Sequence, residues 1–177
     1  MQRRLLLSTA VAAPLVMAGC AGPQMADFAG QKPVLDLAEY FNGRIDGYGM
    51  FQDRSGNVVK RFTVVMDCSW KGNTGVLDEA FTYSDGTTER RVWTLIRGEN
   101  GSYTGTAGDV VGVAKGQTAG NAFHWNYTLN LPVDGKTWEV QLDDWMYLID
   151  ERIMLNRATM SKFGVRVGDL TLSFTKR

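Results

Sequence analysis

Two charged residues, Glu79 and Arg91, occupy positions where the sequence pattern otherwise predicts an apolar face, and they are the first candidates for chemistry. Each lies in a run in which apolar residues recur at every second position. The dipeptide Asp85-Gly86 between the two runs is typical of a hairpin turn. Hairpin pairing brings Glu79 and Arg91 together, and because an isolated buried charge is costly, the two must pair. The apolar residues that share their parity are Leu77, Phe81, Tyr83, Trp93 and Leu95.

Three roles are open to this pair. A structural ion pair that fixes the register of the strands is the first interpretation. The second is a polar anchor for the headgroup of a ligand in a mostly apolar cavity, and the third is a catalytic role.

Asp144 raises the same question on a later strand. An unbroken strand would bury it, whereas a β-bulge between Asp143 and Asp144 would turn Trp145 and Tyr147 inward, and we favour the bulge. Pairing of the last strands makes Arg157 the expected partner of Asp144. Adjacent residues of a strand point to opposite faces, so the two acids are not expected to share a substrate, and a structural role again comes first.

The remaining reactive side chains predict no catalytic or metal centre. His124, the single histidine, lies on a polar parity and is expected at the surface or rim, while Cys68 lies among apolar residues and is expected to be a buried, inert thiol. One histidine and two cysteines are too few for a zinc site of His and Cys ligands, and no phosphate-binding glycine loop is present. The sequence therefore predicts no cofactor.

The elements that must position these residues are strands, because the dominant period from Gly43 onward is two. Between residues 121 and 131, alternate positions are apolar: Phe123, Trp125, Tyr127, Leu129 and Leu131. Residues 62–70 and 170–174 repeat this pattern, and turn signals rich in Gly, Asn and Asp separate the runs. Each run is typical of a half-buried strand.

About nine or ten strands are expected over residues 34–177, at a spacing that suits long meander strands. A sheet of that many strands usually closes, since closure removes exposed edges. The sequence therefore predicts an all-β domain with a single antiparallel up-and-down barrel, with a two-sheet sandwich as the alternative. Residues 34–41 are expected to form a short helix or an extended lead-in to the first strand.

The N-terminus has the features of a targeting segment. Arg3 and Arg4 precede an uncharged apolar run that ends at Met17-Ala18-Gly19-Cys20, and this run is too short to span a bilayer permanently. The segment resembles a bacterial lipoprotein signal peptide, which implies cleavage after residue 19, a diacylglycerol on the Cys20 thiol, and a linker to residue 33. The alternatives are an ordinary signal peptide with a coincidental cysteine and a buried N-terminal helix.

The resemblance also implies a location. Ala21 follows Cys20, where an Asp favours the inner membrane in familiar lipoproteins, so we expect an outer-membrane lipoprotein that faces the periplasm. The inner membrane is the less favoured alternative, and the Arg3-Arg4 pair leaves export by the Sec or the twin-arginine route open.

Composition limits the partners of the mature chain. The first 19 residues carry two of the 19 basic residues and none of the 19 acidic ones, so removing them leaves 158 residues with a net charge of −2. That length is enough for one domain, and the slight negative charge argues against nonspecific binding to nucleic acid.

Several motifs resemble a family of uncharacterised bacterial lipoproteins, a domain of unknown function with a lipocalin-like or calycin-like barrel. They include Tyr40-Phe41-Asn42-Gly43, residues 79–86, Arg91-Val92-Trp93, Asp143-Asp144-Trp145-Met146 and residues 156–164. The resemblance covers nearly all of the mature chain and implies the barrel, but it brings no established activity.

We therefore expect an envelope lipoprotein whose barrel binds a hydrophobic or amphipathic small molecule, a lipid or fatty acyl chain. Glu79 and Arg91 would orient a polar headgroup, and Trp93, Trp125 and Tyr127 would line the apolar part, with Asp144 and Arg157 as further candidates. One alternative is a structural or interaction protein with a packed barrel, whose protein partner the sequence does not identify. The other is an enzyme that acts on modified lipids through Arg91 or Asp144.

Overall fold

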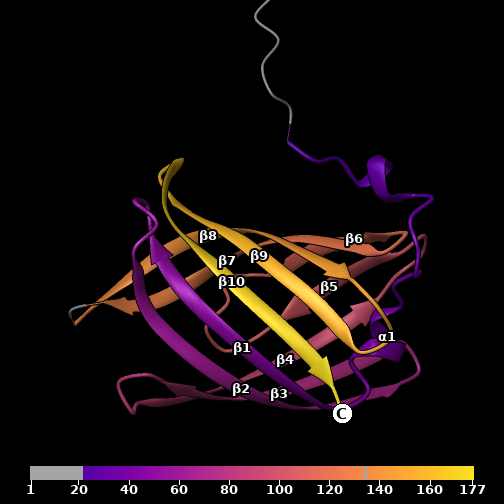
Figure 1. The fold of residues 1–177 in the computed structure, drawn as a ribbon, viewed down its shortest axis with the longest axis horizontal. Helices are drawn as coiled ribbons and strands as arrows, with labels where there is room; N and C mark the ends of the chain where they lie inside the picture. Colours follow the sequence, from indigo (N-terminus) through magenta and orange to yellow (C-terminus); the bar gives the residue numbers. More distant parts are fainter. Residues whose placement is uncertain (1–21, 134) are drawn as a thin grey trace, which may run out of the picture.

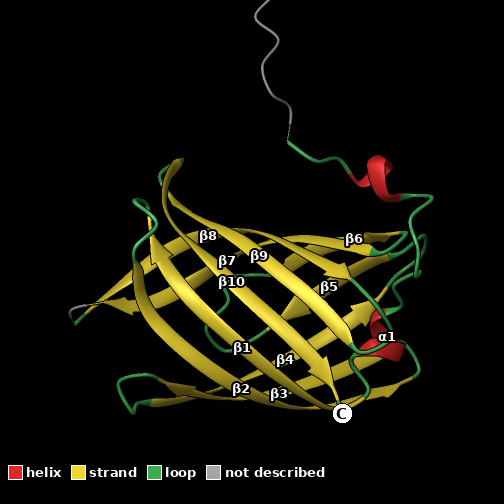
Figure 2. Cartoon of the chain, viewed as in Figure 1, coloured by secondary structure: helices red, strands yellow, loops and turns green. Residues whose placement is uncertain are grey.

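One closed antiparallel sheet makes up almost the whole domain. The computed structural model describes residues 22–133 and 135–177, and in them ten strands follow one another around a ring (Figures 1 and 2). The ring closes where β1 (Gly43–Asp53) pairs with β10 (Val165–Lys176). The prediction of a single up-and-down barrel is confirmed, and the alternative of a two-sheet sandwich is wrong.

The other strands run in chain order between these two and pair with their sequence neighbours. They are β2 (Val58–Lys71), β3 (Thr74–Tyr83), β4 (Thr88–Arg97), β5 (Ser102–Thr106), β6 (Ala114–Ala119), β7 (Ala122–Val133), β8 (Lys136–Leu148) and β9 (Ile153–Lys162).

The alternation of the sequence decides which side chains lie inside. In β2, Phe62, Val64 and Met66 are buried while Arg61 and Thr63 are exposed. Because the side-chain period of a strand is two, a slip of one residue would expose this whole apolar set. The pattern therefore specifies the register as well as the strand.

The short helix α1 (Leu37–Tyr40) closes one end of the barrel, at the right in Figure 1. The carboxylate of Asp36 caps it by accepting a hydrogen bond from the backbone N–H of Ala38 at 2.8 Å. Leu37 and Tyr40 are buried, and the Tyr40 hydroxyl donates to the carbonyl oxygen of Arg152 at 2.9 Å. Of the two conformations expected for residues 34–41, the structure has the helical one, and its apolar face plugs the lumen.

Part of the expected linker packs on the outer wall of the barrel. The 3-10 helix η1 (Met25–Phe28) places the Phe28 ring 5.6 Å from the ring of Trp145 and 5.5 Å from that of Tyr147, measured between centroids. The expected signal peptide and Cys20 lie outside the described residues. Within the described ranges, no helix has the length and apolar character that a membrane span requires.

The barrel wall is irregular between β4 and β7. Strand β5 pairs only with Thr94–Arg97 of β4, so the first half of β4 has no strand on that side. The segment 107–113 crosses this region and bonds to the edge of β7, where Val111 donates to the Thr128 carbonyl at 2.9 Å and Asn130 donates to the Asp109 carbonyl at 2.8 Å. This segment therefore brings Asp109 to the wall beside β4.

Candidate functional site

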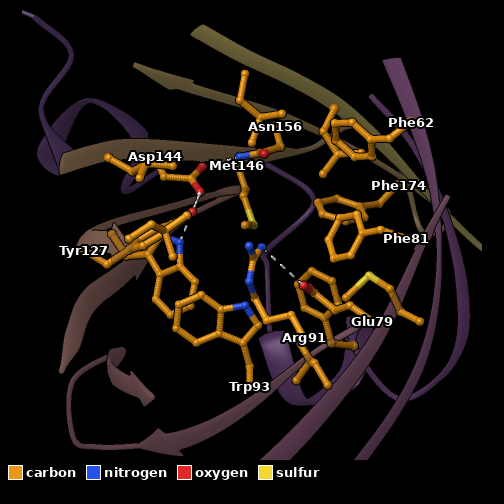
Figure 3. Close-up of a pocket in the computed structure, with 18 of the residues that line it drawn as sticks. Phe62, Glu79, Phe81, Arg91, Trp93, Tyr127, Asp144, Met146, Asn156 and Phe174 are labelled. Carbon is orange, nitrogen blue, oxygen red and sulfur yellow. Dashed lines mark hydrogen bonds and ion pairs between the residues drawn. The ribbon is translucent and has the colours of Figure 1, made fainter. Parts of the chain in front are cut away.

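A narrow cavity of about 110 Å³ occupies the lumen. Figure 3 shows aromatic and methionine side chains around it, with a few polar groups among them. The apolar lining includes Phe62, Met66, Phe81, Trp93, Trp125, Tyr127, Leu142, Met146, Met160 and Phe174, and the polar lining includes Glu79, Glu89, Arg91, Asp144 and Asn156.

Glu79 and Arg91 are direct cross-strand partners, as the hairpin turn predicted. They face each other in the pairing of β3 with β4, and an Arg91 guanidinium nitrogen lies 3.8 Å from a carboxylate oxygen of Glu79. The Arg91 side chain is only 15% exposed, and both residues line the cavity. The expected juxtaposition of the two charges is confirmed.

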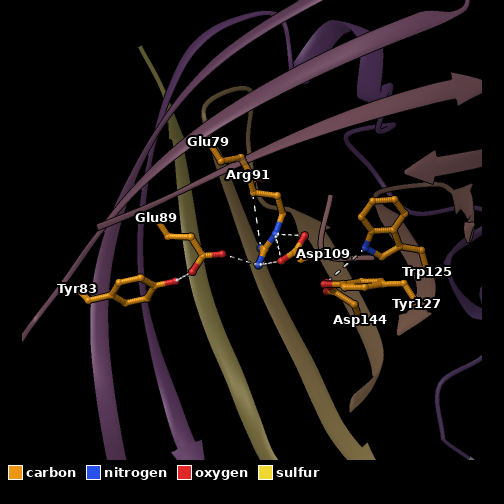
Figure 4. Close-up of polar contacts among 8 residues, drawn as sticks. All are labelled: Glu79, Tyr83, Glu89, Arg91, Asp109, Trp125, Tyr127 and Asp144. Carbon is orange, nitrogen blue, oxygen red and sulfur yellow. Dashed lines mark hydrogen bonds and ion pairs between the residues drawn. The ribbon is translucent and has the colours of Figure 1, made fainter. Parts of the chain in front are cut away.

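Asp109 is the stronger partner of Arg91. Its carboxylate accepts hydrogen bonds from Nε and Nη2 of the guanidinium at 2.9 and 2.7 Å (Figure 4). Two such bonds fix the plane of the guanidinium as well as its position. Because Asp109 comes from segment 107–113, this contact ties that segment to β4.

Glu89 adds a third carboxylate to the cluster. It lies two residues before Arg91 on β4 and therefore on the same face of the strand. Its carboxylate lies 3.4 Å from Nη2 of Arg91 and accepts a hydrogen bond from the Tyr83 hydroxyl at 2.7 Å. Arg91 therefore faces three carboxyl groups, from β3, from β4 and from segment 107–113.

The Glu79 carboxyl is the least satisfied member of this cluster. Glu79 is 8% exposed, and within the described ranges no hydrogen bond joins its carboxyl to another residue. Burial raises the pKa of Glu79 to about 7, although the Arg91 guanidinium opposes this shift. At neutral pH the group is thus divided between its acid and its carboxylate form.

Asp144 is buried on an unbroken strand, so the prediction of a bulge beside it is wrong. The pairing of β8 with β7 and with β9 runs through Asp143 and Asp144 without a shift, and Asp144 is 2% exposed. Trp145 and Tyr147 consequently lie on the outer face, where they contact Phe28. The three neutral donors around Asp144, rather than a bulge, make its burial tolerable.

Those donors are Tyr127, Trp125 and Asn156. The Tyr127 hydroxyl and the Trp125 indole N–H donate to one oxygen of Asp144 at 2.9 and 3.3 Å, and the Asn156 amide donates to the other. Burial raises the pKa of Asp144, and these hydrogen bonds oppose the shift.

Arg157 is not the partner of Asp144. It pairs with Trp145 across β8 and β9, and it is exposed on the outer face, whereas Asp144 faces inward. The expectation that Arg157 lines the site is therefore wrong for this structure. Asn156, one residue earlier and on the inner parity, takes the expected place of Arg157 beside Asp144.

The predicted aromatic residues lie together in the wall of the cavity. The ring centroid of Trp93 lies 4.6 Å from that of Trp125 and 5.4 Å from that of Tyr127. Gly105 makes room for them, since a Cβ there would lie 2.9 Å from the Trp125 ring. All three aromatics line the cavity, as expected.

His124 and Cys68 lie where the sequence placed them. His124 is on the outer face, stacked on Trp145 at 4.0 Å, with Nε2 2.5 Å from a carboxylate oxygen of Asp143. Cys68 is buried, and desolvation raises the pKa of its thiol to about 12, which makes it a poor nucleophile. Among residues 22–133 and 135–177, no three His, Cys, Asp or Glu side chains are arranged to hold a metal ion.

Sequence reasoning missed Asp109, Glu89 and Asn156. Glu89 shares the parity of Arg91, so the strand pattern contained the signal for it. Asn156 likewise sits on the inner parity of β9. Asp109 lies in an irregular segment, and no periodicity points it toward Arg91.

The closed meander, the plugged end and the lined lumen define a calycin-like, lipocalin-like barrel. The family described as "Protein of unknown function (DUF3833)" matches residues 14–176, and the chain belongs to that family. A comparison with the curated proteins found no match.

Two of the solved structures that match this chain differ in the extent of their likeness. The S-type phycobiliprotein lyase CPES from Guillardia theta is similar with a TM-score of 0.60 and 9% identity, over 88% of this chain and 98% of that one. EF1p2_mFAP2b bound to DFHBI has a TM-score of 0.45 and 11% identity, over 79% of this chain and 96% of that one. At such identity the likeness to the lyase concerns the fold alone.

Proposed function

We propose that the barrel binds a slender amphipathic small molecule, with its apolar chain in the lumen and its polar head at the Arg91 cluster. The observation that carries this proposal is a largely buried set of charged groups on the wall of an otherwise apolar cavity. Helix α1 closes one end of the lumen, so the chain of the ligand would end against it. A lipid or fatty acyl chain has this shape and polarity.

The size of the cavity restricts the ligand. About 110 Å³ is less than the roughly 300 Å³ at the lower end of ordinary ligand pockets. A single chain fits better than a ring system, and the flexible side chains of Met66, Met146 and Met160 are able to move aside for it. The same small volume favours the second candidate function, a packed barrel that holds no ligand and meets a protein partner.

Filling the lumen separates these two candidates. We expect wild-type protein purified from cells to carry an amphiphile that native mass spectrometry and lipid extraction recover, and Leu142→Trp to lose at least about nine-tenths of it, because the indole would occupy the cavity. Gln141→Trp is the matched control, since the neighbouring side chain is exposed on the outer wall and its replacement leaves the lumen unchanged.

Circular dichroism checks that both variants keep the barrel, and Met160→Phe serves as a milder filling variant if Leu142→Trp does not fold. A wild-type protein that carries no amphiphile and takes up none from added dodecanol would contradict ligand binding and support the packed barrel.

We also propose that the mature chain is an outer-membrane lipoprotein that faces the periplasm, with several acyl chains at Cys20 holding it stably to the bilayer. The support is the N-terminal resemblance: two arginines, an apolar run, and small residues before the cysteine.

Labelling tests the anchor directly. We expect radiolabelled palmitate to enter the wild-type chain and to be absent from Cys20→Ala, because the thiol is the acceptor. Cys68→Ala is the control and should label like wild type, since that thiol is buried in the barrel. An unlabelled wild-type chain, or label that survives in Cys20→Ala, would overturn the anchor without affecting the ligand site.

A further inference from the structure

The charges around the lumen indicate which headgroup the site accepts. We propose that the ligand is a cationic amphiphile, a single alkyl or acyl chain with an ammonium head that lies against Glu79. This inference rests on the proposed function, since it names the class of ligand for the same cavity.

Acidic groups outnumber basic ones at the cavity. Four carboxyl groups, those of Glu79, Glu89, Asp109 and Asp144, lie in or beside the lining, against the single guanidinium of Arg91. Two of them already engage that guanidinium closely, Asp109 at 2.7 Å and Glu89 at 3.4 Å. Asp109 already holds Nε and Nη2 of Arg91, and an anionic head at the remaining Nη1 would lie beside Glu79 among like charges, which is unfavourable in a site of low dielectric.

The carboxyl group of Glu79 is the acceptor that is available to the headgroup of a ligand. The residue is 8% exposed and its side chain 11% exposed, it lines the lumen, and among the described residues its carboxyl accepts no hydrogen bond. Its nearest cation is Arg91, at 3.8 Å and beyond hydrogen-bond distance. Figure 3 shows Glu79 and Arg91 on one side of the pocket, with Tyr127 and Asp144 across from them. An ammonium group has three donors and would satisfy this carboxylate directly.

The aromatic side chains that line the cavity also favour a positively charged headgroup. Trp93, Trp125 and Tyr127 lie within 5.4 Å of one another in ring-centroid distance, and Phe81 already holds the Arg91 guanidinium 5.4 Å from its ring. The faces of such rings attract cations, most strongly where water is excluded. Asp144 lies among these aromatics, but both of its carboxylate oxygens already accept hydrogen bonds, from Tyr127, Trp125 and Asn156. Glu79 is therefore the acid that binds the head, and the rings line the same cavity.

The test compares three probes that share one chain and differ in the head: dodecylammonium, dodecanol and dodecanoate. Isothermal titration calorimetry at pH 8, below the micelle concentrations, measures their affinities for the full chain. We expect dodecylammonium to bind at least about tenfold more tightly than dodecanoate, as close opposite charges at a desolvated site require. Glu79→Gln should weaken the binding of dodecylammonium at least about tenfold and leave the affinity for dodecanol unchanged.

Glu139→Gln is the matched control, because Glu139 is an exposed acid on the outer parity of β8 and should leave all three affinities unchanged. Dodecanoate binding as tightly as dodecylammonium, or Glu79→Gln binding the ammonium like wild type, would overturn the cationic head while leaving amphiphile binding intact. Failure of all three probes to bind would instead overturn the proposed function.

Discussion

Replacing Arg91 with methionine is expected to lower the free energy of unfolding by about 3–5 kcal/mol at pH 8, the usual loss when one partner of a buried ion pair is removed. The guanidinium is 15% exposed and is the common partner of Glu79, Glu89 and Asp109. Without it these carboxyl groups repel one another, and segment 107–113 loses the side-chain contact that ties it to β4. Urea denaturation followed by tryptophan fluorescence measures the change.

Arg90→Met is the matched control for this variant. Arg90 is the adjacent residue and also makes a two-bond ion pair, with Asp78, but on the solvent side of the same strands. Exposed pairs contribute little, so the control should unfold close to wild type. Adding Asp109→Asn to Arg91→Met should restore part of the lost stability. Equal effects of the Arg90 and Arg91 variants would contradict the buried cluster.

Replacing Glu79 with glutamine is expected to raise the stability at high pH, even though it removes a member of the ion cluster. The pKa of Glu79 lies at about 7 in the folded protein against an ordinary value of 4.5, so the folded state holds the proton more tightly than the unfolded one. Glu79 therefore makes its full contribution to the free energy of unfolding below pH 4.5, and this contribution is lost as the pH rises toward and through 7. The total loss in wild type is about 3 kcal/mol, from 1.36 kcal/mol per pKa unit.

The glutamine variant lacks this loss because its side chain does not ionise. Denaturation from pH 4 to pH 9 should give nearly equal stability for the two proteins at the acid end and an advantage of about 3 kcal/mol for Glu79→Gln above pH 7.5. Glu139→Gln, on the outer wall, should follow the wild-type curve. A glutamine variant that is less stable than wild type at pH 8.5 would show that the Arg91 contact outweighs the desolvation of Glu79.

Much of the site followed from local pattern. Glu79 and Arg91 lie on two strands joined by one tight hairpin, so their pairing depends only on the turn and on the period of two. Both of these features are visible in the sequence. Trp93, Trp125 and Tyr127 lie on inner parities of strands that the same period identified. Two expectations for Asp144 were wrong, the bulge and the partner Arg157. A buried acid among apolar residues suggested that the alternation must break, whereas the strand runs through Asp144 unbroken and places Arg157 on the outer face.

The sequence by itself determined the strands and the inner faces and favoured the closed meander, because alternation at a period of two is a local property that burial of one sheet face enforces. Only the tertiary structure decided that Asp109 binds Arg91, that Asn156 rather than Arg157 serves Asp144, and that the lumen is narrow. The first depends on the path of an irregular loop, the second on the register of β8 against β9, and the third on how side chains from opposite walls fill the space between them.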